Sequence, residues 1–274
     1  MTRLMRFKNL ITWVLITIVA TSADAADQAR REWTVDGVVR ESLVSVPEKA
    51  KSELTPVVFG FHGHGGSMNN AARSFRYHEL WPEAIVVYMQ GLKTPGQLTD
   101  PEGLRAGWQK EKGDLKDRDL KFFDAVLLSL KTDYRIDESR IYSSGHSNGG
   151  GFTYLLWAER GENFAAFAPS GSAALKIRTL LKPKPVFLVA GENDPLVKYQ
   201  WQKMMIETLK ELNQCEDGKT WDGKARLFPS KTGNPVITLI TDHGHKFPAE
   251  APPLIVKFFK EHARIESHES DRKK

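Results

Sequence analysis

The chain alternates short, continuously apolar runs with longer stretches of helical period, and this alternation constrains its fold more than any other feature. The apolar runs have the length of β-strands and occupy, in chain order, residues 57–61, 84–88, 141–144, 164–168, 185–190 and 236–240. Runs that are apolar at nearly every position are typical of strands covered on both faces. The sequence therefore predicts an α/β fold with a mainly parallel central sheet and helices on both faces.

Helical patterns fill the intervals between these runs. Segment 120–134 places its large apolar residues at helical spacing, and 152–158, 200–212 and 253–262 are further helix candidates. Residues 33–46 alternate between polar and apolar, which favours a leading antiparallel hairpin around a glycine. No internal repeat or long linker divides the chain, so we expect one domain over residues 26–264.

The two ends differ from the rest of the chain. Basic residues precede an apolar stretch at 10–20, and Ala23 and Ala25 occupy the two positions that a signal peptidase reads. We expect residues 1–25 to be a signal peptide, with an uncleaved anchor as the alternative. The mature protein would then be exported to the periplasm or the medium and would have no stable membrane span. The densely charged residues 265–274 predict a disordered tail.

Charge and cysteine content narrow the choice of partners. Charged residues make up 27% of the 274 residues, and the formal net charge of +5 is modest, so nothing favours nucleic-acid binding. Cys215 is the only cysteine, so no internal disulfide can form.

The pentapeptide Gly145-His146-Ser147-Asn148-Gly149 follows the run at 141–144 and opens a predicted helix. A serine on such a tight strand-to-helix turn adopts a strained backbone conformation that exposes its hydroxyl group. Free N–H groups at the start of the helix favour negative charge beside it. The pattern therefore predicts that Ser147 is a nucleophile.

Two later segments also follow strand-like runs. In open α/β sheets, sites form beyond the carboxyl ends of the strands. Asp194 follows the run that ends at residue 190, and two histidines, His243 and His245, follow the run that ends at residue 240. The chain order Ser, Asp, His is that of the α/β-hydrolases, in which histidine moves the serine proton and the acid orients the histidine. His243 competes with His245 as the base, and Asp242 and Glu192 compete with Asp194 as the acid.

A glycine-rich loop, His62-Gly63-His64-Gly65-Gly66, follows the run at 57–61. Its glycines would let the backbone bend until an N–H group faces a substrate carbonyl oxygen, although a simple glycine-rich turn is the alternative. We expect the N–H groups of His64 and Asn148 to form an oxyanion hole.

Trp108 would be a substrate contact if it stacked on a substrate ring, or else a core tryptophan. Three histidines raise the question of a metal, but His62, His64 and His146 are dispersed and no H-E-x-x-H helix is present. We therefore expect neither a metal nor another cofactor.

Five motifs together resemble a known family. They are His62-Gly63-His64-Gly65-Gly66, Gly107-Trp108, Asp117-Arg118-Asp119, Gly145-His146-Ser147-Asn148-Gly149-Gly150 and Gly244-His245-Lys246-Phe247-Pro248. They are similar to those of the polyhydroxybutyrate depolymerase and feruloyl esterase family of secreted α/β-hydrolases, from about residue 57 to residue 262. The resemblance implies Ser147 as nucleophile, Asp194 as acid and His245 as base. The chain departs from the family where His64 replaces a common cysteine and Phe247 replaces the usual tryptophan.

These observations predict a secreted serine carboxylic-ester hydrolase that works through an acyl-enzyme. An exported acyltransferase or a serine peptidase on the same scaffold is the alternative, and a non-catalytic binding module is a weaker one. The expected partner is a small or oligomeric ester of plant cell-wall or polyester origin, with feruloyl, acetyl-xylan and hydroxyalkanoate esters all open. We expect acyl specificity to depend on residues 97–116.

Overall fold

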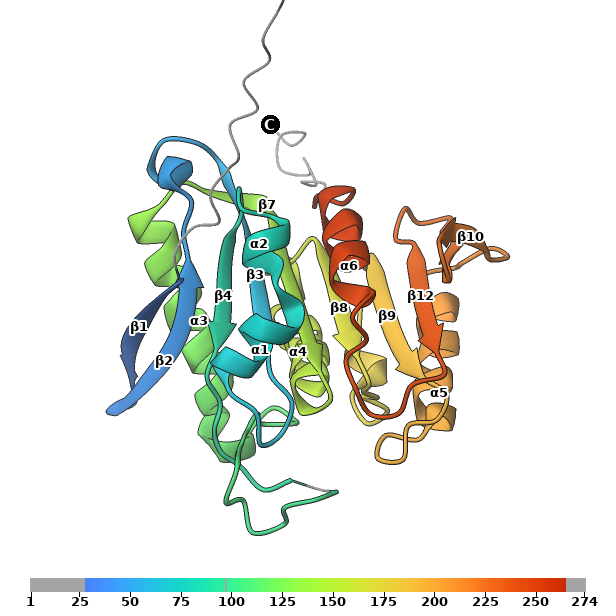
Figure 1. Cartoon of the computed structure of the whole chain (residues 1–274), viewed down its shortest axis with the longest axis horizontal. Coiled ribbons are helices and arrows are strands. Elements are labelled where there is room, and N and C mark those ends of the chain that lie inside the picture. Colours follow the sequence, from blue (N-terminus) through green and yellow to red (C-terminus); the bar gives the residue numbers. More distant parts are fainter. Residues whose placement is uncertain (1–27, 97, 265–274) are drawn as a thin grey trace, which may run out of the picture.

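The computed structural model describes residues 28–96 and 98–264, and its centre is one ten-stranded β-sheet (Figure 1). Six strands run parallel in its middle, in the spatial order β4 (Ile85–Met89), β3 (Thr55–Phe61), β7 (Ile136–His146), β8 (Ala166–Ser170), β9 (Val186–Gly191) and β12 (Val236–Thr241). The mainly parallel sheet expected from the sequence is confirmed. The predicted signal peptide, 1–25, and the predicted tail, 265–274, lie outside the described residues.

Antiparallel pairs extend the sheet at both edges. One edge consists of β1 (Gln28–Val35) and β2 (Val38–Ser45), which confirms the predicted leading hairpin. Asp36 and Gly37 both have positive φ, the conformation that a tight two-residue hairpin turn requires. The opposite edge consists of β11 (Ala225–Phe228) and β10 (Lys219–Asp222), which the sequence did not predict.

Helices cover both faces of the sheet, as Figure 1 shows. One face packs against α3 (Arg118–Asp133), α4 (Asn148–Arg160) and α5 (Tyr199–Leu212). The other packs against α1 (Met68–Phe75), α2 (Tyr77–Leu80) and α6 (Ala251–Lys260). The remaining elements are the short pair β5 (Leu92–Lys93) and β6 (Ala106–Gly107), and the 3₁₀ turns η1 (Glu48–Lys51), η2 (Asp114–Asp117), η3 (Gly161–Asn163) and η4 (Arg178–Leu180).

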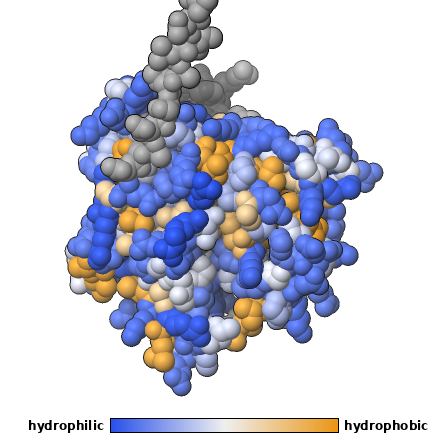
Figure 2. Space-filling model, viewed as in Figure 1, coloured by the Kyte–Doolittle hydropathy of each residue, from blue (hydrophilic) through white to orange (hydrophobic). Residues whose placement is uncertain are grey.

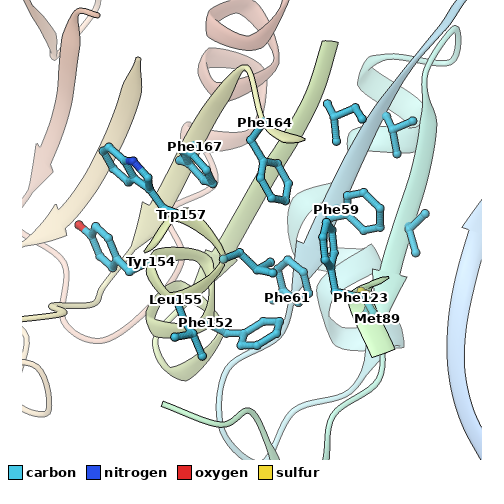
Figure 3. Close-up of a cluster of buried hydrophobic side chains, with 14 of the residues drawn as sticks. Phe59, Phe61, Met89, Phe123, Phe152, Tyr154, Leu155, Trp157, Phe164 and Phe167 are labelled. Atoms are coloured by element: carbon cyan, nitrogen blue, oxygen red, sulfur yellow. The ribbon is translucent and has the colours of Figure 1, made fainter. Parts of the chain in front are cut away.

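The two faces of the sheet carry separate hydrophobic cores. In β3, Phe59 and Phe61 belong to one core and Val58 to the other, because successive side chains of a strand point to opposite faces. Phe59 packs against Phe123 of α3, and Phe61 packs against Phe152 of α4, with ring centroids 5.0 Å apart in both pairs (Figure 3). This double coverage explains why the central strands are apolar throughout.

The surface contrasts with these cores. The face drawn in Figure 2 is largely hydrophilic, with small hydrophobic patches among polar side chains. Across residues 28–96 and 98–264, no helix combines the length and the apolar character needed to cross a membrane.

Candidate active site

Ser147 lies on the sharp turn between β7 and α4. Its backbone has φ 56° and ψ −120°, a conformation that side-chain-bearing residues rarely adopt. Its N–H group donates to the carbonyl of Ser170 at 2.8 Å, and its own carbonyl accepts from Gly151 at 2.9 Å. These bonds to β8 and α4 hold the strained turn in place.

The glycines around Ser147 are required by close backbone contacts. A Cβ atom at Gly145 would overlap the carbonyl of Gly149, and one at Gly149 would overlap the carbonyl of Phe61. At Gly63, a Cβ would lie only 3.4 Å from the Cβ of Ser147. The spacing of small residues in this motif thus allows β3, β7 and α4 to meet closely at the serine.

The structure brings Ser147, His245 and Asp194 into one hydrogen-bonded line. His245 Nε2 lies 2.7 Å from Ser147 Oγ, and His245 Nδ1 lies 2.7 Å from Asp194 Oδ2. The side chain of Asp194 is 1% exposed and that of His245 is 14% exposed. Because Asp194 accepts at Nδ1, Nε2 is left to accept the serine proton.

Backbone and side-chain donors fix Asp194. Its Oδ1 accepts from the N–H groups of Leu196 and Val197, both at 2.9 Å, and its Oδ2 also accepts from Gln202 Nε2 at 3.1 Å. Gln202 is a buried residue of α5 whose importance the sequence analysis missed. A polar residue in an amphipathic helix carries no mark of burial in the sequence, so no signal singled it out.

The competing residues lie apart from this line. His243, Asp242 and Glu192 are exposed, and within the described residues their side chains form no hydrogen bond with Ser147 or His245. Gly191 at the end of β9 leaves room for the histidine loop, since a Cβ there would come within 2.5 Å of the carbonyl of His243.

His64 and Asn148 both line a cavity beside Ser147. Within the described chain, neither of their backbone N–H groups donates a hydrogen bond to another protein group. Gly65 N–H donates to Ala106 at 2.7 Å, which anchors the glycine-rich loop next to His64. Two backbone N–H groups without a protein partner thus belong to residues that line the same cavity as Ser147, and an oxyanion hole needs such donors.

Trp108 does not contact the cavity. Its side chain is fully buried, stacks on Phe152 with centroids 5.3 Å apart, and donates through Nε1 to the carbonyl of His62 at 2.9 Å. The prediction that the Trp108 indole contacts the substrate is therefore wrong, because no part of the ring reaches the surface. Its backbone instead binds Asn148: Trp108 N–H donates to Asn148 Oδ1 at 2.7 Å, and Asn148 Nδ2 donates to Trp108 O at 3.1 Å.

Two histidines near the site are held neutral. Burial lowers the pKa of His62 to about 4 and that of His146 to about 3. His62 Nδ1 donates to Gly63 O at 2.8 Å, and its Nε2 accepts from Gly91 N–H at 3.0 Å. Its neutral ring therefore joins the glycine-rich loop to the segment that follows β4.

The cavity beside Ser147 has a volume of about 620 Å³. Its apolar lining is formed by Leu98, Leu175, Ile177, Leu196, Val197 and Trp201. Lys176 and Glu111, whose side chains pair at 2.8 Å, also line it. Across the described part of the chain, no three His, Cys, Asp or Glu side chains converge to form a metal site.

Known proteins share this fold, and some of them are similar to the chain in sequence. No protein-family model matches the chain. A protein of Aspergillus terreus named "Probable feruloyl esterase C" is 27% identical over 256 residues, which cover 87% of this chain and 90% of that protein. A thermostable esterase of known structure has a TM-score of 0.62 and 21% identity, covering 87% of this chain and 64% of that one. An acetyl xylan esterase from Aspergillus awamori has a TM-score of 0.60 and 13% identity, covering 85% and 99%.

These similarities confirm the α/β-hydrolase fold and the feruloyl esterase side of the family resemblance. The polyhydroxybutyrate depolymerase side has no support among these relatives. The chain therefore has the α/β-hydrolase fold, and its sequence is similar to that of the feruloyl esterases over most of its length.

Proposed function

We propose that the chain is an exported serine carboxylic-ester hydrolase that works through an acyl-enzyme. The observation that supports this most directly is the continuous line of hydrogen bonds from Ser147 Oγ through the His245 ring to Asp194, with 2.7 Å at each step. The leader-like residues at the N-terminus support export.

In the first half of the reaction, Ser147 Oγ attacks the ester carbonyl carbon while its proton moves to His245 Nε2. The negative charge that develops on the carbonyl oxygen is stabilised by the N–H groups of His64 and Asn148. When the tetrahedral intermediate collapses, the C–O bond to the alcohol breaks and the alcohol oxygen takes the proton from Nε2. Asp194 keeps the imidazole in the useful tautomer and stabilises it while it is charged.

In the second half, a water molecule attacks the acyl-enzyme and His245 Nε2 accepts its proton. A second tetrahedral intermediate forms at the same N–H groups. Its collapse breaks the bond to Ser147 Oγ, which recovers its proton from His245 and releases the carboxylic acid.

For the substrate, we propose an ester with a bulky aromatic acyl group of the feruloyl type. The cavity volume of about 620 Å³ lies in the range of roughly 300–1,000 Å³ that sites for drug-sized ligands occupy. Its apolar side chains, among them Trp201 and Ile177, suit an aromatic ring better than an acetyl group. Parallel assays on methyl ferulate, acetylated xylan and hydroxybutyrate oligomers test this choice. Faster turnover of acetylated xylan than of methyl ferulate would contradict it.

The mechanism itself is tested with Ser147→Ala. The variant is expected to lose turnover of a short-chain p-nitrophenyl ester and labelling by a fluorophosphonate probe, because both need the Oγ nucleophile. Circular dichroism and thermal unfolding would show that the fold is retained. Substantial activity in a folded Ser147→Ala protein would rule out the proposed mechanism.

A further inference from the structure

Asp100 is a buried carboxylate in the loop between β5 and β6, and it does not contact the catalytic line. It accepts three hydrogen bonds: from Leu104 N–H at 3.2 Å, from Arg105 N–H at 2.9 Å and from His64 Nε2 at 3.0 Å. A carboxylate can only accept, so the His64 ring carries its proton on Nε2. The Arg105 N–H group, helped by the His64 bond, lowers the pKa of Asp100 to about 2.

The His64 ring is closely confined as well as bonded. A Cβ atom at Gly96 would lie 2.8 Å from its Nε2, and one at Gly107 would lie 2.7 Å from its Nδ1. Its side chain is only 11% exposed, and that of Asp100 is 7% exposed. The ring therefore occupies a slot between two glycines, with the carboxylate at its end.

We propose that Asp100 is a positioning residue that binds the His64 ring and thereby fixes the His64 backbone N–H where the oxyanion forms. This inference rests on the proposed function. The N–H group of the neighbouring Gly65 donates to the carbonyl of Ala106 on β6. The loop is therefore held both at the His64 ring and at the next residue along the chain.

The second donor is held on the same short segment. Asn148, whose N–H is the other member of the oxyanion hole, binds the backbone of Trp108 through both atoms of its amide group. Trp108 directly follows β6. The loop that Asp100 organises therefore sets the separation of the two donors, while the bonds among Ser147, His245 and Asp194 do not involve it.

The test compares Asp100→Asn with the wild-type enzyme. Loss of one oxyanion donor typically lowers kcat by about 10²–10³-fold, and a misplaced donor loses part of that. We expect kcat to fall by roughly 10- to 100-fold with little change in KM, since the donor acts mainly on the transition state. The affinity of an aryl boronic acid, whose adduct with Ser147 places an oxygen in the same hole, should fall in parallel.

Two further variants make the test specific. Glu83→Gln removes an exposed acid outside this loop and should leave both kcat and boronic-acid affinity unchanged. His64→Leu removes the ring bond while Asp100 keeps its bonds to Leu104 and Arg105, so it also serves if Asp100→Asn fails to fold. If Asp100 acts through His64, the double variant should be no slower than the slower single variant.

Unchanged kcat and boronic-acid affinity in folded Asp100→Asn or His64→Leu would overturn the positioning role, and so would effects that multiply in the double variant. A wild-type protein with no esterase activity and no fluorophosphonate labelling of Ser147 would instead contradict the proposed function. The two failures are thus distinguishable in one set of assays.

Discussion

At the scale of single residues, His62 links the site to the pH dependence of stability. In the unfolded chain a histidine takes up a proton near pH 6.5, whereas burial lowers the pKa of folded His62 to about 4. Between these values the unfolded state binds more protons, so stability falls as the pH falls. One such histidine accounts for about 3 kcal/mol between pH 7 and pH 4.

His62→Gln removes this titration while keeping one donor and one acceptor in the side chain. We expect the variant to lose about 3 kcal/mol less unfolding free energy than the wild type between pH 7 and pH 4. Urea unfolding at several pH values measures the difference, with His243→Gln as the control for replacing an exposed histidine. Equal pH slopes in wild type and His62→Gln would show that burial does not hold His62 neutral.

At the scale of elements, the start of α4 carries three glycines with different surroundings. A Cβ at Gly149 would overlap backbone carbonyls of β3 and the following residue, whereas at Gly151 no atom lies within 4 Å. Glycine inside a helix costs about 0.5–1 kcal/mol relative to alanine. Packing therefore requires glycine at position 149 but not at position 151, so the two positions can be compared directly.

Gly151→Ala is expected to raise the unfolding free energy by roughly 0.5–1 kcal/mol, whereas Gly149→Ala should lower it by several times that amount. Denaturant unfolding of both variants checks the contrast. If Gly149→Ala proved as stable as Gly151→Ala, the close meeting of α4 with β3 would not be as described.

At the scale of the whole molecule, a buried ion pair ties the edge of the sheet to α3. Arg40 of β2 donates to Asp119 Oδ1 at 2.8 Å and to the carbonyl of Arg118 at 3.0 Å, and both charged side chains are almost fully buried. Asp119 Oδ2 accepts from Gln109 N–H at 2.8 Å. The Asp-Arg-Asp motif noted in the sequence thus contributes an acid that joins β2, α3 and the segment after Trp108.

Removing one partner of a buried pair leaves the other charge without compensation, which typically costs about 3–5 kcal/mol. We expect this loss of unfolding free energy in both Arg40→Met and Asp119→Asn. The double variant Arg40→Met/Asp119→Asn should lose less than the two single losses combined, as urea unfolding would show. Additive losses would mean that the two side chains do not stabilise each other.

Much of the architecture followed from the sequence, because a doubly covered strand must be apolar at nearly every position. The ends of elements were less predictable. β7 begins at Ile136, five residues before the predicted run, since the polar residues at its start lie at the edge of the core. The pairs β5–β6 and β10–β11 were missed because strands of two to four residues are too short to show a periodic pattern.

The residues of the candidate site were likewise predictable only in part. Ser147, Asp194 and His245 could be proposed because each follows a recognisable strand, and the structure places them within hydrogen-bonding distance. Gln202 and Asp100 could not, because their neighbours come from distant parts of the chain and only the folded backbone brings donor and acceptor together. Trp108 was left between two interpretations, since an indole has the same appearance in a sequence whether it is buried or exposed.

Under the proposed mechanism, the backbone conformation of Ser147 disfavours folding at the same residue whose hydroxyl group is needed for turnover. With φ 56° and ψ −120°, the turn would suit glycine better than any residue with a side chain, so the proposed nucleophile is kept at a conformational cost. In a lineage released from the need for catalysis, this codon should be among the first to drift to glycine. Retention of serine at this position in distant descendants would then indicate that the residue still serves catalysis.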